Sequence, residues 1–190
     1  FAYYYNEFGT EIHLVEMKAR VLPVEDEDVS KEVASNFKKS GIKISLGTKV
    51  SQIESLKTKV KVHTEKDDKK EILEGDLALL AVGVTGNIEK IGLENLGITT
   101  ANGAIKINEF NQTNIQNIYA IGDVSGPPWL AHLASAQGHV AADHAAGHET
   151  KPVDYSNIPG CTYCQPQVGS LGMTEAQAKE KGHDVKVGKF

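Results

Sequence analysis

The stretch NIYAIGDVSGPPWLAHLASAQGHVAADHAAG, from Asn117 to Gly147, decides the fold. An apolar segment, IYAI, ends at Gly122 and Asp123, and two prolines separate it from a long run of small residues. A short apolar run that ends at a glycine is typical of a buried strand, and an alanine-rich run favours a helix. The stretch therefore predicts a strand, a tight turn and a slender helix that begins near Leu130 and ends near Ala146.

The turn has the chemistry of a ligand site. Gly122 allows the backbone to turn tightly and a ligand to approach, and Asp123 can accept hydrogen bonds from sugar-alcohol hydroxyls. The start of the next helix offers free N–H groups and partial positive charge, which suits the negatively charged edge of a reduced flavin. The alternative is a small-residue helix packed tightly in a core, and Asp123 decides in favour of the ligand site.

The rest of the chain alternates between helix and strand patterns. Val29, Val33 and Phe37 recur at helical spacing within a helix from about 26 to 40, with acids at its start and lysines at its end. Apolar runs predict further strands, and alternating residues predict an antiparallel β segment. The expected elements are a helix end at 1–8, strands at 10–16 and 42–46, antiparallel β over 49–74, a parallel strand buried on both faces at 76–83, strands at 102–110 and 117–123, a linker from 151, a helix at 174–182 and the start of a strand at 183–190.

Glu16 ends a short buried strand, where a carboxylate can accept hydrogen bonds from the adenine-ribose hydroxyls of a dinucleotide. Such a carboxylate would repel a 2′-phosphate and favour NAD over NADP. The alternative is an exposed acid at a strand end. Cys161 and Cys164 form a C-x-x-C motif, which we interpret as two small apolar positions in a strand rather than a redox or metal site. His144 and His148 are expected on a solvated turn, and no metal site is predicted.

Composition excludes several classes of partner. The 190 residues carry a formal net charge of -5, and the lysines are scattered, so neither nucleic acid nor an anionic membrane is an expected partner. No apolar run approaches the roughly 18 residues of a membrane span. Two cysteines do not make a disulfide framework, so a cytoplasmic location is the default expectation.

The segment NIYAIGDVSGPPWLAH resembles the second FAD-binding segment of the flavin-dependent disulfide reductases, and most closely that of the dihydrolipoyl dehydrogenase family. Three further segments resemble, in order, other parts of the same family: GTEIHLVEMKARVLPVEDEDV, LALLAVGVTGNIEKIGLENLGI and NIPGCTYCQPQVGSLGMTEAQAKEKG. The resemblance implies an α/β fold: a Rossmann-like, doubly wound FAD/NAD(P)-binding sheet, incomplete here, with an antiparallel β insertion and the start of an α+β interface domain. It implies the end of an NAD-binding domain at 1–83, a segment of an FAD-binding domain at 84–150 and the start of a dimerisation domain at 151–190.

The same resemblance implies roles for single residues. Glu16, Val50 and Gly83 would line the NAD site, and Gly122 and Asp123 would bind the ribityl chain of FAD. The backbone of the segment that starts the long helix would lie at the flavin ring; its residues are Trp129, Leu130, Ala131 and His132. Val84 and Trp129 replace the arginine and methionine that the family often has, and both should be tolerated because the contact is chiefly through backbone.

The resemblance also implies parts that this sequence does not contain, namely the redox-active C-x4-C pair, the glycine-rich NAD turn and the His–Glu acid–base pair. No catalytic residue is therefore predicted in the chain, which we expect to be an internal fragment without activity by itself and with apolar surface, FAYYY included, exposed. The parent would be a homodimer that oxidises dihydrolipoamide carried by an acyltransferase of a 2-oxo-acid dehydrogenase complex, through a disulfide and FAD to NAD+. The alternatives are a related reductase of glutathione, mercuric ion or a nicotinamide, and a non-catalytic nucleotide-binding or interaction module.

Overall fold

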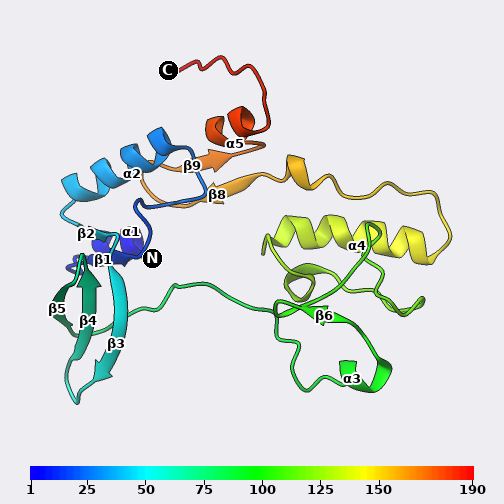
Figure 1. The fold of residues 1–190 in the computed structure, drawn as a ribbon, viewed down its shortest axis with the longest axis horizontal. Helices are drawn as coiled ribbons and strands as arrows, with labels where there is room; N and C mark the ends of the chain where they lie inside the picture. Colours follow the sequence, from blue (N-terminus) through cyan, green and yellow to red (C-terminus); the bar gives the residue numbers. More distant parts are fainter. The chain divides into compact units, whose positions relative to one another are not determined.

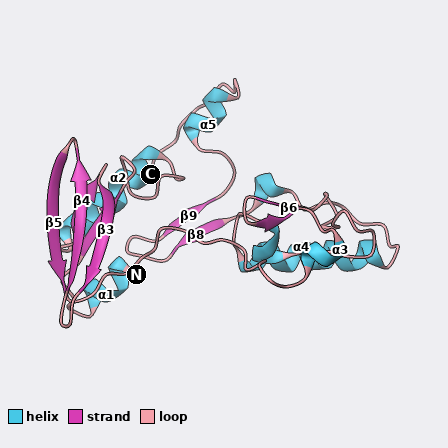
Figure 2. Ribbon diagram, turned by 60° about the horizontal axis from the view of Figure 1, so that its bottom comes forward, coloured by secondary structure: helices cyan, strands magenta, loops and turns pink.

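The computed structural model describes all 190 residues, which form two compact units. One unit combines residues 1–80 with 159–190, and the other comprises residues 81–158. The first unit contains most of the β-structure, and the second contains the longest helix (Figures 1 and 2).

The first unit is built around two parallel strands and one helix. Strand β1 (His13–Glu16) pairs in parallel with β2 (Lys43–Leu46), so that Glu16 lies opposite Leu46. Helix α2 (Glu27–Lys39) connects them, and it buries Val33 and Phe37. Its first turn is acidic and its last turn is basic, as the helix dipole favours. A parallel strand–helix–strand unit is the repeating element of doubly wound sheets.

The other elements of this unit are an N-terminal helix and an antiparallel sheet. Helix α1 comprises Ala2–Glu7. Strand β4 (Val60–Lys66) lies at the centre of the sheet, between β3 (Lys49–Ser55) and β5 (Lys69–Gly75). The predicted antiparallel segment is therefore confirmed, with its register interrupted between Val50 and Gln52.

The C-terminal segment belongs to the same core. Strands β8 (Gly160–Thr162) and β9 (Val168–Ser170) form a hairpin, and helix α5 (Glu175–Glu180) follows. Cys164 and Val168 join the buried cluster of Val21, Val33, Phe37 and Ile42. Asp26, which precedes α2, accepts a hydrogen bond from the Glu175 amide (2.8 Å), and Thr174 and Gln177 complete a capping box on α5.

The second unit has little sheet and one long helix. Helix α4 (Ala131–Ala145) agrees with the predicted helix, and its buried residues are Leu133, Gln137, Val140 and Ala141. A separate apolar cluster contains Leu93, Ile98, Ile105 and Ala120. The remaining elements are α3 (Leu93–Leu96), β6 (Thr100–Ala101), β7 (Ala104–Ile105), the 3-10 turn η1 (Gly122–Ser125) and the 3-10 turn η2 (Tyr155–Asn157).

Aromatic packing fixes the C-terminal end of α4. The His144 imidazole stacks on Phe110 with ring centroids 4.6 Å apart, and its Nδ1 lies 2.8 Å from the Tyr119 hydroxyl. The expectation that His144 sits on a solvated turn is therefore wrong, although His148 is exposed.

Three of the predicted strands are absent, and a further one is shorter than predicted. Residues 76–83 form no strand, and Leu77 and Val82 are 91% and 92% exposed. A strand buried on both faces needs neighbouring strands and covering helices, and β1 pairs only with β2. Of the predicted strand 117–123, residues 117–121 make only an isolated bridge, between Gln112 and Tyr119, and the last two residues belong to η1. Residues 183–190 have no partner strand. Of the predicted strand 102–110, only Ala104–Ile105 forms, in a hairpin with Thr100–Ala101.

The two cysteines differ in environment. Cys161 lies in β8 and is exposed, whereas Cys164 follows the strand and is buried. Both are free thiols. Burial raises the pKa of the Cys164 thiol, which also lies within 3.1 Å of the Pro166 carbonyl oxygen that it can donate to. Cys164 thus fills a core position, as the small-apolar interpretation expects, and Cys161 does not.

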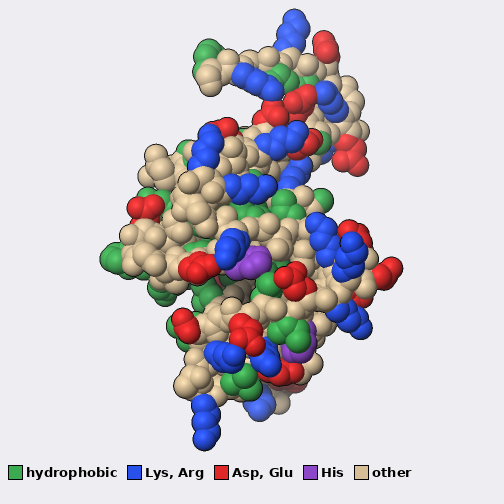
Figure 3. Space-filling view, turned by 90° about the vertical axis from the view of Figure 1, so that its left-hand side faces the viewer, with side chains coloured by type: hydrophobic (Ala, Val, Ile, Leu, Met, Phe, Trp, Pro, Cys, Tyr) green, Lys and Arg blue, Asp and Glu red, His purple; other side chains and the backbone are tan.

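The surface carries charges of both signs. On the face in Figure 3, basic and acidic side chains are interspersed rather than gathered into one patch. None of the helices is both long enough and apolar enough to cross a membrane.

The cysteine environments predict unequal thiol reactivity. We expect a disulfide reagent at pH 8 to modify one thiol quickly in the native chain, because the raised pKa of Cys164 leaves little thiolate and burial limits access. Cys161→Ser should abolish the rapid phase, and Cys164→Ser should leave it intact. Rapid reaction of both thiols in one phase would contradict the assignment.

The exposed apolar residues of 77–82 predict self-association of the isolated chain, because contiguous apolar surface is rarely left in water. Light scattering at micromolar concentration should detect species larger than the 20.5 kDa monomer. Replacing Leu77, Leu79 and Leu80 by serine should shift the population toward monomer. A control with three scattered exposed residues replaced (Val24, Leu96 and Val187 to serine) should not, and monodisperse wild-type monomer would contradict the prediction.

Candidate functional site

The candidate site is the turn η1 together with the start of α4. Gly122 has φ +71°, a left-handed conformation that favours glycine, and a Cβ added there would lie 3.3 Å from the Ala134 Cβ on α4. The Ser125 hydroxyl donates to the Gly122 carbonyl (2.7 Å) and closes the turn. The sequence therefore requires glycine at this position both for its backbone angle and for the close approach of the helix.

Asp123 is exposed, and its carboxylate has no hydrogen-bond or ion-pair partner among the residues of the chain. It lies in the first turn of η1. A charged carboxylate held on a well-fixed turn, with its acceptors unused, can accept hydrogen bonds from the hydroxyls of a ligand.

The start of α4 is open. Leu130 is the N-cap residue, and its side chain makes no capping hydrogen bond. The first amides of an α-helix have no intrahelical acceptor, so this end offers donors and partial positive charge. Ala131 and His132 are exposed there. Seven of the fifteen residues of α4 are alanine or glycine, which leaves room for a flat group beside its first turns.

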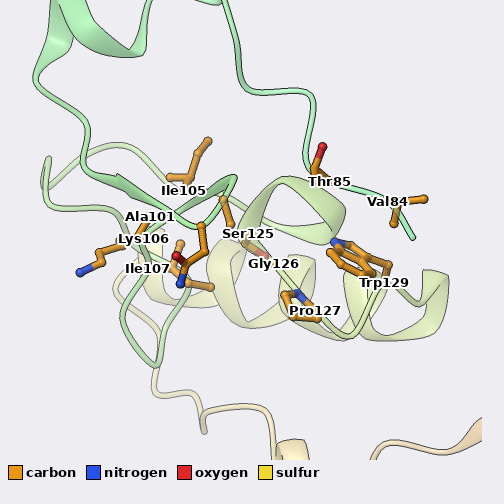
Figure 4. A pocket seen from close by; sticks show the side chains of 12 residues that line it. Val84, Thr85, Ala101, Ile105, Lys106, Ile107, Ser125, Gly126, Pro127 and Trp129 are labelled. Atoms are coloured by element: carbon orange, nitrogen blue, oxygen red, sulfur yellow. The ribbon is translucent and has the colours of Figure 1, made fainter. Parts of the chain in front are cut away.

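A pocket of about 660 Å³ lies next to this turn (Figure 4). Ser125, Gly126, Pro127 and Trp129 form one part of its wall. The rest is formed by Val84 and Thr85, the β6–β7 hairpin and the two residues that follow it, Lys106 and Ile107. Trp129 is 39% exposed. Of the residues predicted to bind a flavin, only Trp129 lines this concave surface, which has both apolar and polar groups.

Sequence reasoning missed Gly86. A Cβ at Gly86 would lie 2.9 Å from the Gly103 carbonyl oxygen and 3.3 Å from the Asp123 carbonyl oxygen. Only glycine allows these three backbone segments to approach so closely, and Gly86 thereby holds the turn against the β6–β7 hairpin. No local signal in the sequence could have identified it, because the contacts come from distant segments.

Gln137 was also missed, although the helical spacing of the buried positions offered a signal. Gln137 is 2% exposed and falls on the same face as Leu133, Val140 and Ala141. Its Oε1 accepts a hydrogen bond from the Gly122 amide (2.7 Å), and its Nε2 donates to the Tyr155 hydroxyl (2.7 Å). A polar residue on an otherwise apolar face of a predicted helix indicates a buried hydrogen-bonding role.

Glu16 is half-buried at the C-terminal end of β1, where the topology predicts it. Its Oε1 accepts a hydrogen bond from the Lys18 amide (2.6 Å), and its Oε2 has no partner in the chain. Val50, in β3, is 40% exposed. Gly83 belongs to the second unit, with φ +129° and no atom within 4 Å of an added Cβ. The roles of these three residues toward NAD stay predictions.

These observations fit a flavin cofactor. The unpartnered Asp123 carboxylate suits a polyhydroxyl chain, the uncapped end of α4 suits a partly negative ring edge, and the small residues of α4 leave space for the ring.

Comparisons with known proteins show the family of the chain. Residues 1–138 match the family model for pyridine nucleotide-disulphide oxidoreductase, and residues 158–190 match the model for the dimerisation domain of the same enzymes. The chain is 42% identical to a dihydrolipoyl dehydrogenase of Rhizobium etli over its whole length and 45% identical to one of Mycobacterium leprae. It spans 40% and 41% of the length of these two relatives.

Solved structures show the same fold. LpdA of Mycobacterium tuberculosis aligns over 95% of this chain and 39% of its own, with a TM-score of 0.86 and 25% identity. The HOCl-induced flavoprotein disulfide reductase RclA of Escherichia coli aligns over 96% of this chain and 42% of its own, with a TM-score of 0.86 and 28% identity. The predicted fold class, part of a Rossmann-like nucleotide-binding fold, is confirmed. The chain belongs to the pyridine nucleotide-disulphide oxidoreductase family.

Proposed function

We propose that the chain is part of an FAD-dependent dihydrolipoyl dehydrogenase, which oxidises dihydrolipoamide and transfers the electrons through an active disulfide and FAD to NAD+. Relatives of that name, 42–45% identical over the whole chain, support this activity. The chain spans about two-fifths of those relatives, so the activity is assigned to a longer protein that contains it.

One observation carries the proposal: the turn at Gly122 presents a free carboxylate, at Asp123, beside the uncapped start of α4. Asp123 would accept hydrogen bonds from the ribityl hydroxyls of FAD. The backbone amides at the start of α4, in the segment of Trp129, Leu130, Ala131 and His132, would face the pyrimidine edge of the ring.

FAD, when bound, would supply the redox chemistry. The residues of the chain would bind this cofactor and orient it. The N–H groups and partial charge of α4 favour negative charge on the neighbouring ring edge, so they stabilise the reduced form of the bound group more than the oxidised form. The small side chains of α4 allow that close approach.

Glu16, Val50 and Gly83 would bind NAD. The free Oε2 of Glu16 would accept from an adenine-ribose hydroxyl, while the Lys18 amide holds Oε1 and fixes the carboxylate. A 2′-phosphate would meet the same negative charge, which supports NAD rather than NADP.

The proposal extends to organisation and partners. Residues 1–83 would end the NAD-binding domain, 84–150 would belong to the FAD-binding domain, and 151–190 would begin the interface domain. The match of residues 158–190 to a dimerisation domain supports a homodimer. The partner would be the dihydrolipoamide-bearing acyltransferase of a 2-oxo-acid dehydrogenase complex, in the cytoplasm.

A second candidate keeps the flavin and changes the substrate. The likeness to RclA, a flavoprotein disulfide reductase, supports this alternative. We therefore propose to assay the intact enzyme with dihydrolipoamide and NAD+, and separately with NADH and oxidised glutathione, mercuric ion or a nicotinamide acceptor. NADH formation that depends on dihydrolipoamide and exceeds the other activities supports the first proposal. Preferred reduction of another acceptor would reject it, and the 190-residue chain alone should show no turnover.

Removing the carboxylate of Asp123 should weaken FAD binding. Asp123→Ala deletes charge-assisted hydrogen bonds, each worth about 1.5–3 kcal/mol, so the Kd for FAD in the intact enzyme should rise about tenfold to a hundredfold. Asp123→Asn, which keeps one acceptor oxygen, should have a Kd for FAD between those of the wild type and Asp123→Ala. Asp143→Ala, an exposed acid on α4, is the matched control. The proposal fails if both alanine variants bind FAD like the wild type.

Glu16 should set the cofactor preference. Glu16→Gln removes the negative charge that a 2′-phosphate would meet, so the kcat/KM ratio of NADH to NADPH should fall by about tenfold or more, since every 1.4 kcal/mol is a factor of ten. Glu7→Gln, which changes an exposed acid on α1, should leave the ratio unchanged. An unchanged ratio in the Glu16 variant would contradict the assigned role.

A further inference from the structure

The most completely hydrogen-bonded buried side chain in the second unit is Gln137. It is 2% exposed, at the centre of α4, and its side-chain amide joins segments that are far apart in the sequence. Its Oε1 accepts from the Gly122 amide (2.7 Å), and its Nε2 donates to the Tyr155 hydroxyl (2.7 Å) and lies 3.4 Å from the Ser125 hydroxyl oxygen. The Asn111 side chain donates to the Gln137 carbonyl oxygen (3.2 Å).

The chemistry of the partners fixes the orientation of this amide. A backbone N–H can only donate, so the group that faces the Gly122 amide must be the acceptor oxygen. The Nε2 group then faces Tyr155 and Ser125, whose hydroxyl oxygens can accept. The amide is therefore locked at both ends, with a hydroxyl on one side and the glycine amide on the other.

This contact acts on the conformation of the turn. Gly122 has φ +71°, and its amide and carbonyl are both held, by Gln137 and by the Ser125 hydroxyl. The next residue is Asp123, whose carboxylate is free. The Gln137 side chain fixes the Gly122 amide and the distance between the turn and α4. It thereby also fixes the direction in which the Asp123 side chain points.

We propose that Gln137 is a positioning residue for the flavin site: it holds the Gly122–Asp123 turn in the conformation that receives the ribityl chain, and Tyr155 holds Gln137. The identity of the ligand in this inference rests on the proposed function, whereas the hydrogen bond between Gly122 and Gln137 does not. Tyr155 lies in η2, at the end of the second unit, so the side chain that secures the turn comes from outside the predicted flavin segment.

Four variants of the intact enzyme test the proposal. Gln137→Met keeps a side chain of similar size and leaves the Gly122 amide without its acceptor, so the Kd for FAD should rise about tenfold or more. Gln137→Glu keeps an acceptor oxygen for the Gly122 amide and can accept a hydrogen bond that the Tyr155 hydroxyl donates, so its Kd for FAD should stay within about threefold of the wild-type value. Tyr155→Phe removes only the second partner and should have an effect between these two.

Val140→Ala is the matched control, because Val140 is buried on the same face of α4 and makes no contact with the turn through hydrogen bonds. It should lower the Tm, as Gln137→Met does, without changing the Kd for FAD or the visible circular dichroism of bound flavin. Equal loss of FAD affinity in Gln137→Met and Val140→Ala would overturn the proposal, because it would reduce Gln137 to a role in folding.

A second readout needs no cofactor. Hydrogen exchange in the unliganded protein should show the Gly122 amide protected in the wild type and in Gln137→Glu, and at least about tenfold faster to exchange in Gln137→Met. The Ala120 amide, which bonds the Asn111 carbonyl, should not change. Unchanged protection of Gly122 in Gln137→Met would overturn the positioning role. A wild-type enzyme that binds no FAD would instead overturn the proposed function, and the exchange result would still decide whether Gln137 holds the turn.

Discussion

The hydrogen bond from the Gly122 amide to the buried Gln137 side chain is the constraint on which the candidate site depends. It connects the part-buried 3-10 turn to α4 at 2.7 Å, through a Gln137 side chain that is only 2% exposed. An unsatisfied buried amide costs about 1–3 kcal/mol, so the turn and the helix are held in one arrangement rather than several. Asp123 and the first turn of α4 are exposed on that rigid support, which is how a binding group is kept ready for a ligand.

The same unit shows how small residues serve the site. Gly122 approaches Ala134, and Gly86 approaches the backbone of Gly103 and Asp123, so that three chain segments meet without side chains between them. A Cβ at Gly86 would lie 2.9 Å from a backbone oxygen and would clash with it, whereas a Cβ at Gly122 would make a tight contact of 3.3 Å with the Ala134 Cβ. The thin helix and the tight turn therefore act together. Both allow backbone segments to approach closely, and they leave the amides at the start of α4 and the Asp123 carboxylate at the surface.

Local signals allowed much of the fold to be predicted from the sequence. The helical spacing of Val29, Val33 and Phe37 predicted α2, and the alternation in residues 49–74 predicted the antiparallel sheet. Residues 76–83 and 117–123 were predicted wrongly as strands, because a strand depends on partners that the local sequence does not reveal. Of the site, Gly122 and the start of α4 were predicted from turn chemistry. Gly86 was not, because its neighbours come from elsewhere in the chain, and Gln137 was overlooked although its place on a buried helix face marked it.

The central claim is that the Gly122–Asp123 turn receives the ribityl chain of FAD. The most direct measurement is a crystal structure of the intact enzyme with FAD bound. The account predicts an Asp123 carboxylate oxygen within hydrogen-bond distance, roughly 2.5–3.0 Å, of a ribityl hydroxyl, with the flavin ring beside the first turn of α4. A flavin bound elsewhere, with Asp123 in contact only with solvent, would contradict it.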